Sequence, residues 1–300
     1  MDTATRLHDY CDFVLGTLGR ADQRRSGEVY VRGLLYCEGR RSIRNIAARI
    51  GGCSEQSLQQ FVNQSPWDPH PVRQRTAAVL TAWVRPSAWV LDEVAFDKHG
   101  EQSAAVDRQF VPSQGRVRNC QLGAVAMLAS ETCAVAVDWR LSVPRSWDGD
   151  ADRRRAAHLP DGERHQPFWR YQMEMLDDLC GDWGVPQAPV VIDARYCLAP
   201  DQLVAELESR GLDYLVRLSG DYTAQRRLVA TTPQRPVHRV TVSWRPPAQA
   251  HSVRSQFAHV AVPAGRRSLL VEWRLGSPTP RGFWLTNMND HPIGELARLV

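Results

Sequence analysis

The sequence predicts an α/β protein in which a mixed sheet lies between an N-terminal helical region and a β-rich region. Three patterns predict this. Apolar residues recur at helical spacing over residues 1–87, short apolar runs alternate with amphipathic helices over 88–218, and Pro and Gly turns divide apolar runs over 219–287. We therefore expect a helical domain, an α/β core, a β-rich insertion and, at 288–300, the start of a final helix.

The helical region begins with apolar residues at helical spacing, namely Leu7, Tyr10, Cys11, Val14 and Leu18. Farther along, Ser42 is the predicted N-cap of a short helix that Gly51-Gly52 ends, and Ser54 is the predicted N-cap of the next helix. Two short helices joined by a Gly-containing turn resemble a helix-turn-helix. A plain helical hairpin that packs on the next domain is the alternative. The basic residues beside this pair, which we interpret as candidate DNA contacts, are Arg40, Arg41, Arg44 and Arg49.

The α/β core is predicted from seven segments that read strand-strand-strand-helix-strand-helix-strand. In chain order they are Ala88–Leu91, Cys120–Ala129, Cys133–Leu141, Phe168–Trp183, Pro189–Ile192, Asp201–Arg210 and Tyr214–Leu218. Residues 142–167 are rich in Pro, Gly and charge and predict an exposed loop, in which Arg153, Arg154 and Arg155 are either solvated or bound to phosphate. The predicted strands of the β-rich region are Val237–Trp244, Gln256–Val262, Leu269–Arg274 and Gly282–Thr286.

Two aspartates carry the functional hypothesis. Asp92 follows the first apolar strand, and Asp193 follows the strand after the first helix of the core. Carboxylates at the ends of neighbouring strands suit Mg²⁺ or Mn²⁺, and two such metals can promote phosphodiester cleavage. The strand order is that of a ribonuclease-H-like nuclease, although an Asp that ends an apolar strand is common in α/β proteins. Glu93 is expected on the opposite face of the strand, in a structural role.

Charge and composition indicate the kind of substrate, the cellular location and the state of the cysteines. Residues 1–90 hold 12 Arg against 8 acidic residues, 91–200 hold 12 basic against 17 acidic residues, and 201–300 hold 13 Arg against 8 acidic residues. An acidic centre between basic flanks suits a polyanion substrate and a central metal, and it also arises by chance. No run approaches the length of a membrane span and no signal peptide is visible, so we expect a cytoplasmic, nucleoid-associated protein. Seven scattered cysteines without a CxxC motif predict reduced core thiols.

The residues around Asp92 resemble a known family. The segment WVLDEVAFDKHGEQSAAVDRQF, followed by GRVRNCQLG, resembles the first-acid block of bacterial insertion-sequence transposases of the DDE type, the DDE-superfamily endonucleases. The resemblance extends upstream through YVRGLLYCEGRRSIRNIAARIGGCSEQSLQQFVNQSPWD and downstream through VDWRLSVPRSW, VVIDARY, GLDYLVRL and FWLTNMND. It implies that Asp92 and Asp193 are the first two metal-binding acids, with Mg²⁺ or Mn²⁺ as cofactor. It also implies double-stranded DNA, as transposon ends and target, as partner.

The third acid of that family has no counterpart here. It belongs to a helix that follows the FWLTN-like strand, and the chain stops where that helix begins. Glu295 lies on the expected element but too early, and Asp290 is predicted in a loop. Whether the chain cleaves DNA is therefore open. It is a truncated transposase, a fragment of a longer enzyme, or a domesticated copy that retains DNA binding for regulation.

Further candidates complete the expected site. Besides the four arginines of the helical region, the basic residues near the first acid are candidate DNA contacts, namely Lys98, Arg116 and Arg118. We also consider a homodimer, and we expect no membrane partner. A small-molecule enzyme that reuses the fold is a further alternative, which a deep apolar pocket away from Asp92 would favour.

Overall fold

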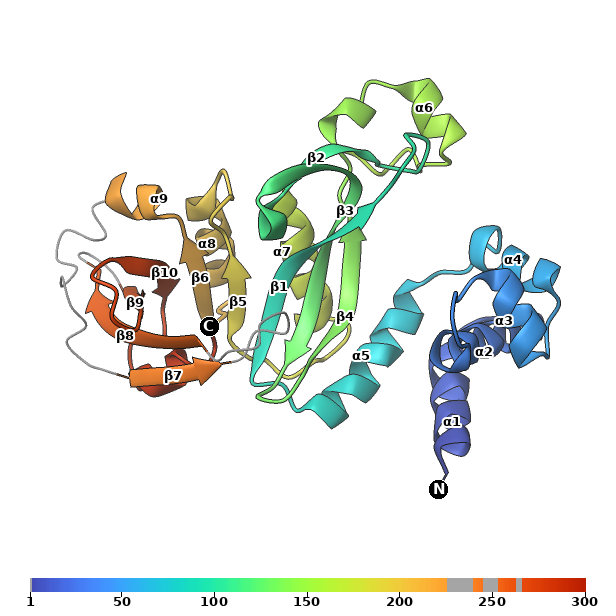
Figure 1. Ribbon diagram of the computed structural model, residues 1–300, viewed down its shortest axis with the longest axis horizontal. Helices are drawn as coiled ribbons and strands as arrows, with labels where there is room; N and C mark the ends of the chain where they lie inside the picture. Colours follow the sequence, from blue (N-terminus) through green and yellow to red (C-terminus); the bar gives the residue numbers. More distant parts are fainter. Residues whose placement is uncertain (1, 226–239, 245–252, 263–265) are drawn as a thin grey trace. The chain divides into compact units, whose positions relative to one another are not determined.

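The chain folds into two compact units. The computed structural model describes residues 2–225, 240–244, 253–262 and 266–300. The first unit is Met1–Leu80 and the second is Thr81–Val300. Figure 1 shows helices in the first unit and a large sheet with helices in the second.

The first unit is helical, as predicted. Its helices are α1 (Thr3–Leu15), α2 (Ala21–Tyr36), α3 (Ile43–Ile50), α4 (Glu55–Asn63) and most of α5 (His70–Val84). The Ser42 hydroxyl accepts a hydrogen bond from the Asn45 amide at 3.3 Å, and the Ser54 hydroxyl accepts one from Ser57 at 3.1 Å. Both predicted N-caps are therefore confirmed. Gly51, at φ +71°, ends α3 in a backbone conformation that glycine adopts without strain.

The core of this unit joins α2, α3 and α4. Ile46 of α3 and Leu58 of α4 are completely buried and belong to one apolar cluster with Val29 and Cys37. Gly33 of α2 allows the close approach of α3, because a β-carbon added at this glycine would lie 2.3 Å from Cγ2 of Ile46. Packing of these apolar side chains is what holds such short helices together, since helices of this length are marginal alone.

Replacing Gly33 with alanine is expected to destabilise the helical unit. Alanine gains up to about 1 kcal/mol of helix propensity. Overpacking against the rigid, β-branched Ile46 costs about 1–3 kcal/mol, so the expected net loss is about 1 kcal/mol. Urea denaturation followed by circular dichroism measures the change. Gly19→Ala is the matched control, because a β-carbon there meets no atom within 4 Å, and an equal loss in both variants would contradict the account.

The second unit is built on one continuous mixed sheet. Its order is β2-β3-β1-β5-β6-β10-β9-β8-β7, with β4 paired to β3 beside this path. β1 pairs in parallel with β5, and β5 with β6, whereas the other pairs are antiparallel. The strands are β1 (Ala88–Asp97), β2 (Asp107–Val111), β3 (Arg116–Ala129), β4 (Ala134–Leu141), β5 (Val190–Asp193), β6 (Tyr214–Leu218), β7 (Val240–Trp244), β8 (Val253–Ala261), β9 (Ser268–Arg274) and β10 (Pro280–Thr286). The predicted α/β class with a mixed sheet is confirmed.

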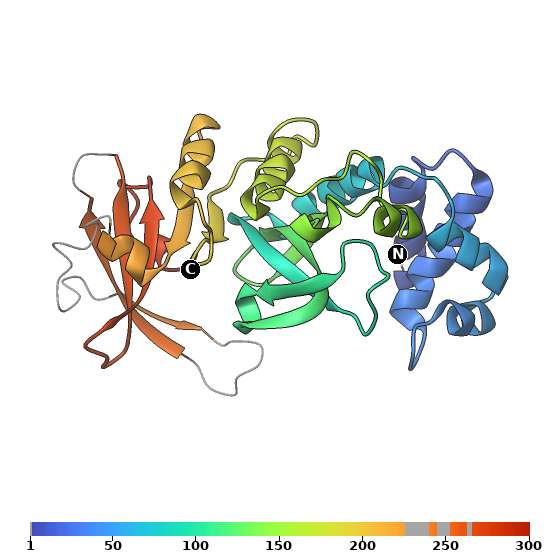
Figure 2. The ribbon, with the colours of Figure 1, turned by 90° about the horizontal axis from the view of Figure 1, so that it is seen from above.

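Helices cover one face of the sheet. The Arg140 guanidinium of β4 pairs with Asp178 of α7 (Phe168–Cys180), and the Tyr214 hydroxyl donates to Glu208 of α8 (Pro200–Ser209) at 2.9 Å. Figure 2 shows α7 in yellow-green and α8 in gold on the same side of the strands. We call this side the α7–α8 face. The short helix α9 (Gly220–Gln225) follows β6.

The opposite side of the sheet is the α10 face, named after α10 (Ile293–Leu296). Leu296 and Ala297 pack here in an apolar cluster that includes Ala88, Val191 and Leu215. Because side chains alternate along a strand, residues two positions farther on lie on the same face. Asp92, Asp193 and Arg217 therefore share the α10 face with this cluster, one row beyond its edge.

Several segment predictions need correction. The first strand does not end at Leu91 but continues to Asp97, because β3 pairs along its whole length. Residues 142–167 are not simply an exposed loop, since they contain a 3₁₀ turn (Arg145–Trp147) and α6 (Ala151–Ala156). The predicted strand 237–244 begins at Val240 within the described residues, and its first three positions lie outside them. The strands predicted in the β-rich region join the main sheet, because β10 pairs with β6.

The triple arginine of that segment has a structural role. Arg154 is buried and donates to the carbonyls of Pro160 at 2.8 Å and Glu163 at 2.6 Å. Arg153 lies over the ring of Trp147, 4.0 Å from its centroid, and donates to the carbonyl of Val106. Among the three, only Arg155 is well exposed, and it pairs with Asp152. Arg154 is therefore bonded within its own loop and Arg153 is bonded to the segment before β2, so neither is free to bind phosphate.

Two further expectations concern the whole chain. All seven cysteines are free thiols, as predicted, but Cys133 and Cys180 are exposed, so their predicted core position is wrong. Among the described helices, none has the length and apolar character needed to cross a membrane.

Candidate metal centre and nucleic-acid interface

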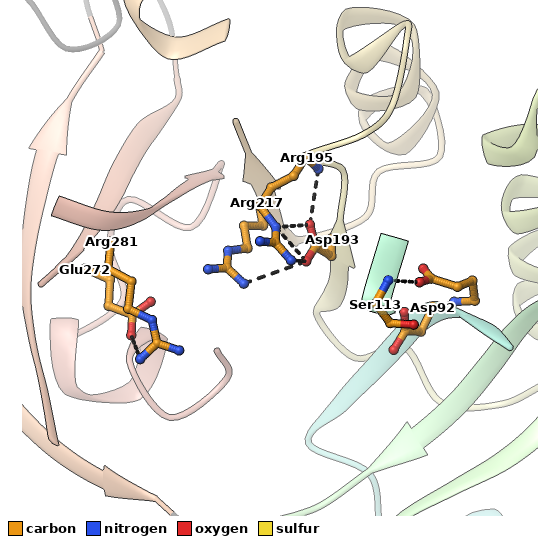
Figure 3. A network of polar contacts seen from close by, with 8 residues as sticks. Asp92, Ser113, Asp193, Arg195, Arg217, Glu272 and Arg281 are labelled. Atoms are coloured by element: carbon orange, nitrogen blue, oxygen red, sulfur yellow. Dashed lines mark hydrogen bonds and ion pairs between the residues drawn. The ribbon is translucent and has the colours of Figure 1, made fainter. Parts of the chain in front are cut away.

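Asp92 and Asp193 lie on neighbouring parallel strands. In the pairing of β1 with β5, Leu91 is the partner of Ile192, so the two aspartates occupy the next position on each strand. Both follow residues of the apolar cluster by two positions, and they therefore project from the same α10 face. Figure 3 shows the two carboxylates on adjacent strands, with Arg195 and Arg217 directed toward Asp193. The structure thus brings together the two acids that the sequence places a hundred residues apart.

Asp92 has an unusually high proton affinity. The pKa of this carboxyl group is raised to about 6, chiefly by burial and in smaller part by the neighbouring carboxylates of Glu93 and Asp193, whereas the hydrogen bond from the Glu93 amide at 2.8 Å opposes the shift. Within the described residues, no basic side chain forms an ion pair with Asp92. This carboxylate therefore lies in an environment that favours an added positive charge.

Asp193 is held by two arginines. The Arg195 guanidinium is bidentate on this carboxylate, with Nε 2.9 Å from Oδ1 and Nη2 2.7 Å from Oδ2, and the Arg195 amide also donates to Oδ1 at 3.1 Å. Arg217 of β6 places Nη1 3.7 Å from Oδ2. Burial lowers the pKa of Arg217 and the nearby charge of Arg195 lowers it further, while Asp193 partly compensates. Asp193 is thus neutralised in a way that Asp92 is not.

The Glu93 carboxylate lies close enough to Asp92 to help raise the pKa of that group, but its hydrogen bond is made elsewhere. Its Oε1 accepts a hydrogen bond from the Ser113 amide at 2.5 Å, in the 3₁₀ turn Pro112–Gln114 that joins β2 to β3. The side chain anchors that turn. The contact with Ser113 gives Glu93 a structural role, whereas its effect on Asp92 shows that this side chain is not isolated from the pair as strand alternation had predicted.

Glu272 of β9 is the next carboxylate on the α10 face, but it belongs to a different cluster. It is buried, its Oε1 accepts from the Ser255 hydroxyl at 2.7 Å, and the nearest Arg281 nitrogen lies 3.8 Å away. β6 and β10 separate β9 from β5 in the sheet, and Figure 3 shows the Glu272–Arg281 pair apart from Asp193. Glu295 of α10 is exposed. Among the described residues, no three His, Cys, Asp or Glu side chains form a group that could hold a metal.

Changing Glu272 to Gln is expected to cost stability without affecting the Asp92–Asp193 pair. The amide keeps the shape but weakens a charge-assisted hydrogen bond to Ser255 and removes the ion pair with Arg281, for a loss of about 1 kcal/mol. Thermal denaturation measures this loss with and without Mn²⁺. A loss of the Mn²⁺-dependent stabilisation in this variant would instead make Glu272 a ligand.

The donor set fits a divalent cation in its chemistry. Two carboxylates on one row supply the hard oxygen atoms that Mg²⁺ and Mn²⁺ prefer. The mutual repulsion that helps to raise the pKa of Asp92 is what a bound cation would relieve. Full access to Asp193 requires the Arg195 guanidinium to move, because it occupies both oxygens.

The four arginines proposed for DNA contact flank and occupy α3. All four are exposed, and Arg49 in addition donates to the carbonyl of Glu38 at 2.6 Å. α3 and α4 are joined by a glycine turn, as a helix-turn-helix requires, but α4 carries no basic residue. The positive charge therefore lies with the first helix of the pair.

The other basic candidates lie near the β2–β3 turn and do not gather at the acids. Arg118 pairs with Asp97, and the Arg116 Nε donates to Gln114 Oε1 at 3.3 Å. By strand alternation Arg116 and Arg118 lie on the α7–α8 face, opposite Asp92. Lys98 follows the end of β1 and is half-buried. Sequence reasoning missed Arg195 and Arg217, although the position of Arg195 two residues after Asp193 was a usable signal.

The comparison with protein families agrees with this geometry. The family model described as DDE superfamily endonuclease matches residues 14–280, which include both aspartates. The chain belongs to the DDE superfamily endonucleases. Its mixed α/β sheet is consistent with the ribonuclease-H-like fold of this family, and membership indicates a transposase-like nuclease with a DNA substrate. None of the curated proteins with which the chain was compared matches it.

Proposed function

We propose that this DDE superfamily endonuclease binds transposon-end DNA and cleaves phosphodiester bonds with a divalent cation held by Asp92 and Asp193. One observation carries the proposal: the β1–β5 register places both carboxylates on one row of one sheet face. Mg²⁺ or Mn²⁺ bound there would supply an activated water and stabilise the leaving oxygen. The bacterial insertion-sequence origin, the homodimer and the nucleoid location belong to the same proposal.

The chain's own residues have separable roles in this proposal. Asp92 and Asp193 hold the cation. Arg195, once displaced from Asp193, remains within reach of the site and is suited to bind a phosphate oxygen through two parallel N–H groups. The helical unit, with exposed Arg40, Arg41 and Arg44, binds duplex DNA outside the site.

A non-catalytic, regulatory DNA-binding protein is the second candidate. Two observations favour it. Asp193 is neutralised by Arg195, and a third metal-binding side chain is missing among the described residues. The predicted truncation before a third acid stays a prediction.

A nicking assay separates the two candidates. The purified chain is incubated with supercoiled plasmid carrying the transposon ends, in Mg²⁺, Mn²⁺ or EDTA, beside Asp92→Asn. The proposal expects metal-dependent nicking that Asp92→Asn abolishes, with DNA binding by gel shift unchanged. Salt-sensitive binding without nicking in either metal would favour the regulatory candidate.

A further inference from the structure

Several large apolar side chains are exposed on the same part of the sheet as the two aspartates. Phe96 of β1 is 54% exposed, Phe110 of β2 is 41% exposed, Val117 of β3 is 51% exposed, and Tyr196, just after β5, is 50% exposed. Single exposed apolar residues are ordinary on protein surfaces. A group of them next to a candidate active site indicates a binding surface. We call these three aromatic residues and the valine together the aromatic surface.

Strand register places the aromatic surface on the α10 face. Phe96 is four positions after Asp92 on β1, so both side chains project to the same side. Phe96 pairs with Gln121 of β3, and Val117, four positions before Gln121, pairs with Phe110. The aromatic surface therefore lies on the same face as the acids, farther along β1 toward its C-terminal end.

A contact between Phe110 and Tyr196 connects the aromatic surface to the segment that carries Asp193. The rings of Phe110 and Tyr196 meet edge to face, with centroids 5.0 Å apart. Tyr196 is three residues after Asp193, and the Arg195 guanidinium lies 5.7 Å from the centroid of its ring. The arginine that holds Asp193 thus also borders the aromatic surface, and Arg108, on β2 beside Phe110, adds an exposed cation on the same face.

We propose that the aromatic surface stacks unpaired DNA bases next to the phosphodiester bond that the acids address. Exposed rings bordered by arginines are how proteins hold single-stranded nucleic acid, since bases stack on the rings and the cations meet the backbone. From Asp92 to Phe96 the strand spans about 13 Å, which equals roughly four nucleotide steps at the rise of one DNA strand. The ligand is therefore a short unpaired segment of the strand being cut. This inference rests on the proposed function for its DNA substrate.

Binding in EDTA tests the aromatic surface without any cleavage. Fluorescence anisotropy compares a labelled oligothymidine with a blunt duplex, using the intact chain, the Phe110→Ala/Tyr196→Ala double variant, Tyr196→Phe and the control Phe13→Ala. Phe13 is an aromatic residue of similar exposure, 46%, on α1. We expect the double variant to lose about 10- to 100-fold in affinity for oligothymidine and less than about twofold for duplex. Tyr196→Phe and Phe13→Ala are expected to bind as the wild type does.

Each other outcome has a defined meaning. Unchanged affinity of the double variant for oligothymidine overturns the inference, and so does an equal loss for duplex and single strand. A change in sedimentation on substitution, with no change in DNA affinity, would assign the surface to a second copy of the chain and also overturns it. The proposed function fails separately, through absent metal-dependent nicking, whereas the stacking readout needs no metal and survives Asp92→Asn.

Discussion

Asp92→Asn is expected to stabilise the metal-free protein at neutral pH. The pKa of Asp92 is about 6 in the folded chain and 3.8 in its usual state. A carboxyl group whose pKa rises on folding destabilises the fold wherever it is ionised in both states, which here is above pH 6. A shift of this size corresponds to at most about 3 kcal/mol, and partial contact with water reduces the expected gain to about 2 kcal/mol.

The stability difference between Asp92→Asn and the wild type is expected to depend on pH. Above pH 6 the gain from asparagine is complete. As the pH falls from 6 to 4 the folded wild type takes up a proton at Asp92 and recovers the lost stability, so the two proteins converge. Thermal denaturation in EDTA at pH 7.5, 6 and 4 measures it, with an expected difference of about 4–8 °C in Tm at pH 7.5.

An exposed aspartate serves as the control for that experiment. Asp152 pairs with Arg155 on the surface of α6, and both side chains are largely exposed. Asp152→Asn is expected to leave Tm unchanged at every pH, because exposed ion pairs contribute little. A lower Tm for Asp92→Asn at pH 7.5 would show that Asp92 is stabilised as a carboxylate and contradict the account.

Arg195→Ala is expected to strengthen metal binding while weakening the metal-free fold. The bidentate guanidinium occupies both oxygens of Asp193. A cation must compete with this contact, so its removal should raise the affinity for Mn²⁺ about tenfold, or about 1.4 kcal/mol. Without metal, the variant leaves Asp92 and Asp193 to repel each other, with Arg217 as the remaining arginine paired with Asp193 among the described residues, and Tm in EDTA should fall.

Isothermal titration with Mn²⁺ measures the first effect and a melt in EDTA the second. Arg195→Lys is the informative companion, because lysine keeps the charge but cannot make two parallel hydrogen bonds. Its metal affinity is expected between those of the wild type and Arg195→Ala. An unchanged or lower affinity in Arg195→Ala would mean that the arginine supports the metal site instead of competing with it.

Local sequence predicted the framework of this site well. Apolar runs located the strands that carry Asp92 and Asp193, and the order of elements predicted the mixed sheet that makes those strands neighbours. Cap residues such as Ser42 and Ser54 act within one helical turn, so their role was also readable. The strand positions and the caps depend on interactions between residues close in the chain or on the simple alternation of a strand, whereas the expected pairing of distant strands came from the order of the elements.

Contacts between distant segments were not readable in this way. The pairing of Phe110 with Tyr196 depends on how β2 registers with β3 and how β5 lies beside β1. The burial of Arg154 depends on carbonyl groups of its own loop, whereas the composition of that loop predicted solvent exposure. Glu272 shows the same limit, because its burial follows from pairing of β9 with β8 and β10.

The central claim is that Asp92 and Asp193 hold a divalent cation, and Mn²⁺ titration of three variants tests it most directly. Asp92→Asn and Asp193→Asn are compared with Glu93→Gln, which changes the neighbouring carboxylate that is bonded to the Ser113 amide. The account predicts saturable Mn²⁺ binding by the wild type, a loss of at least about tenfold in both aspartate variants, and a change below about threefold in Glu93→Gln. Equal affinity in Asp92→Asn and Glu93→Gln, or no saturable binding by the wild type, would contradict it.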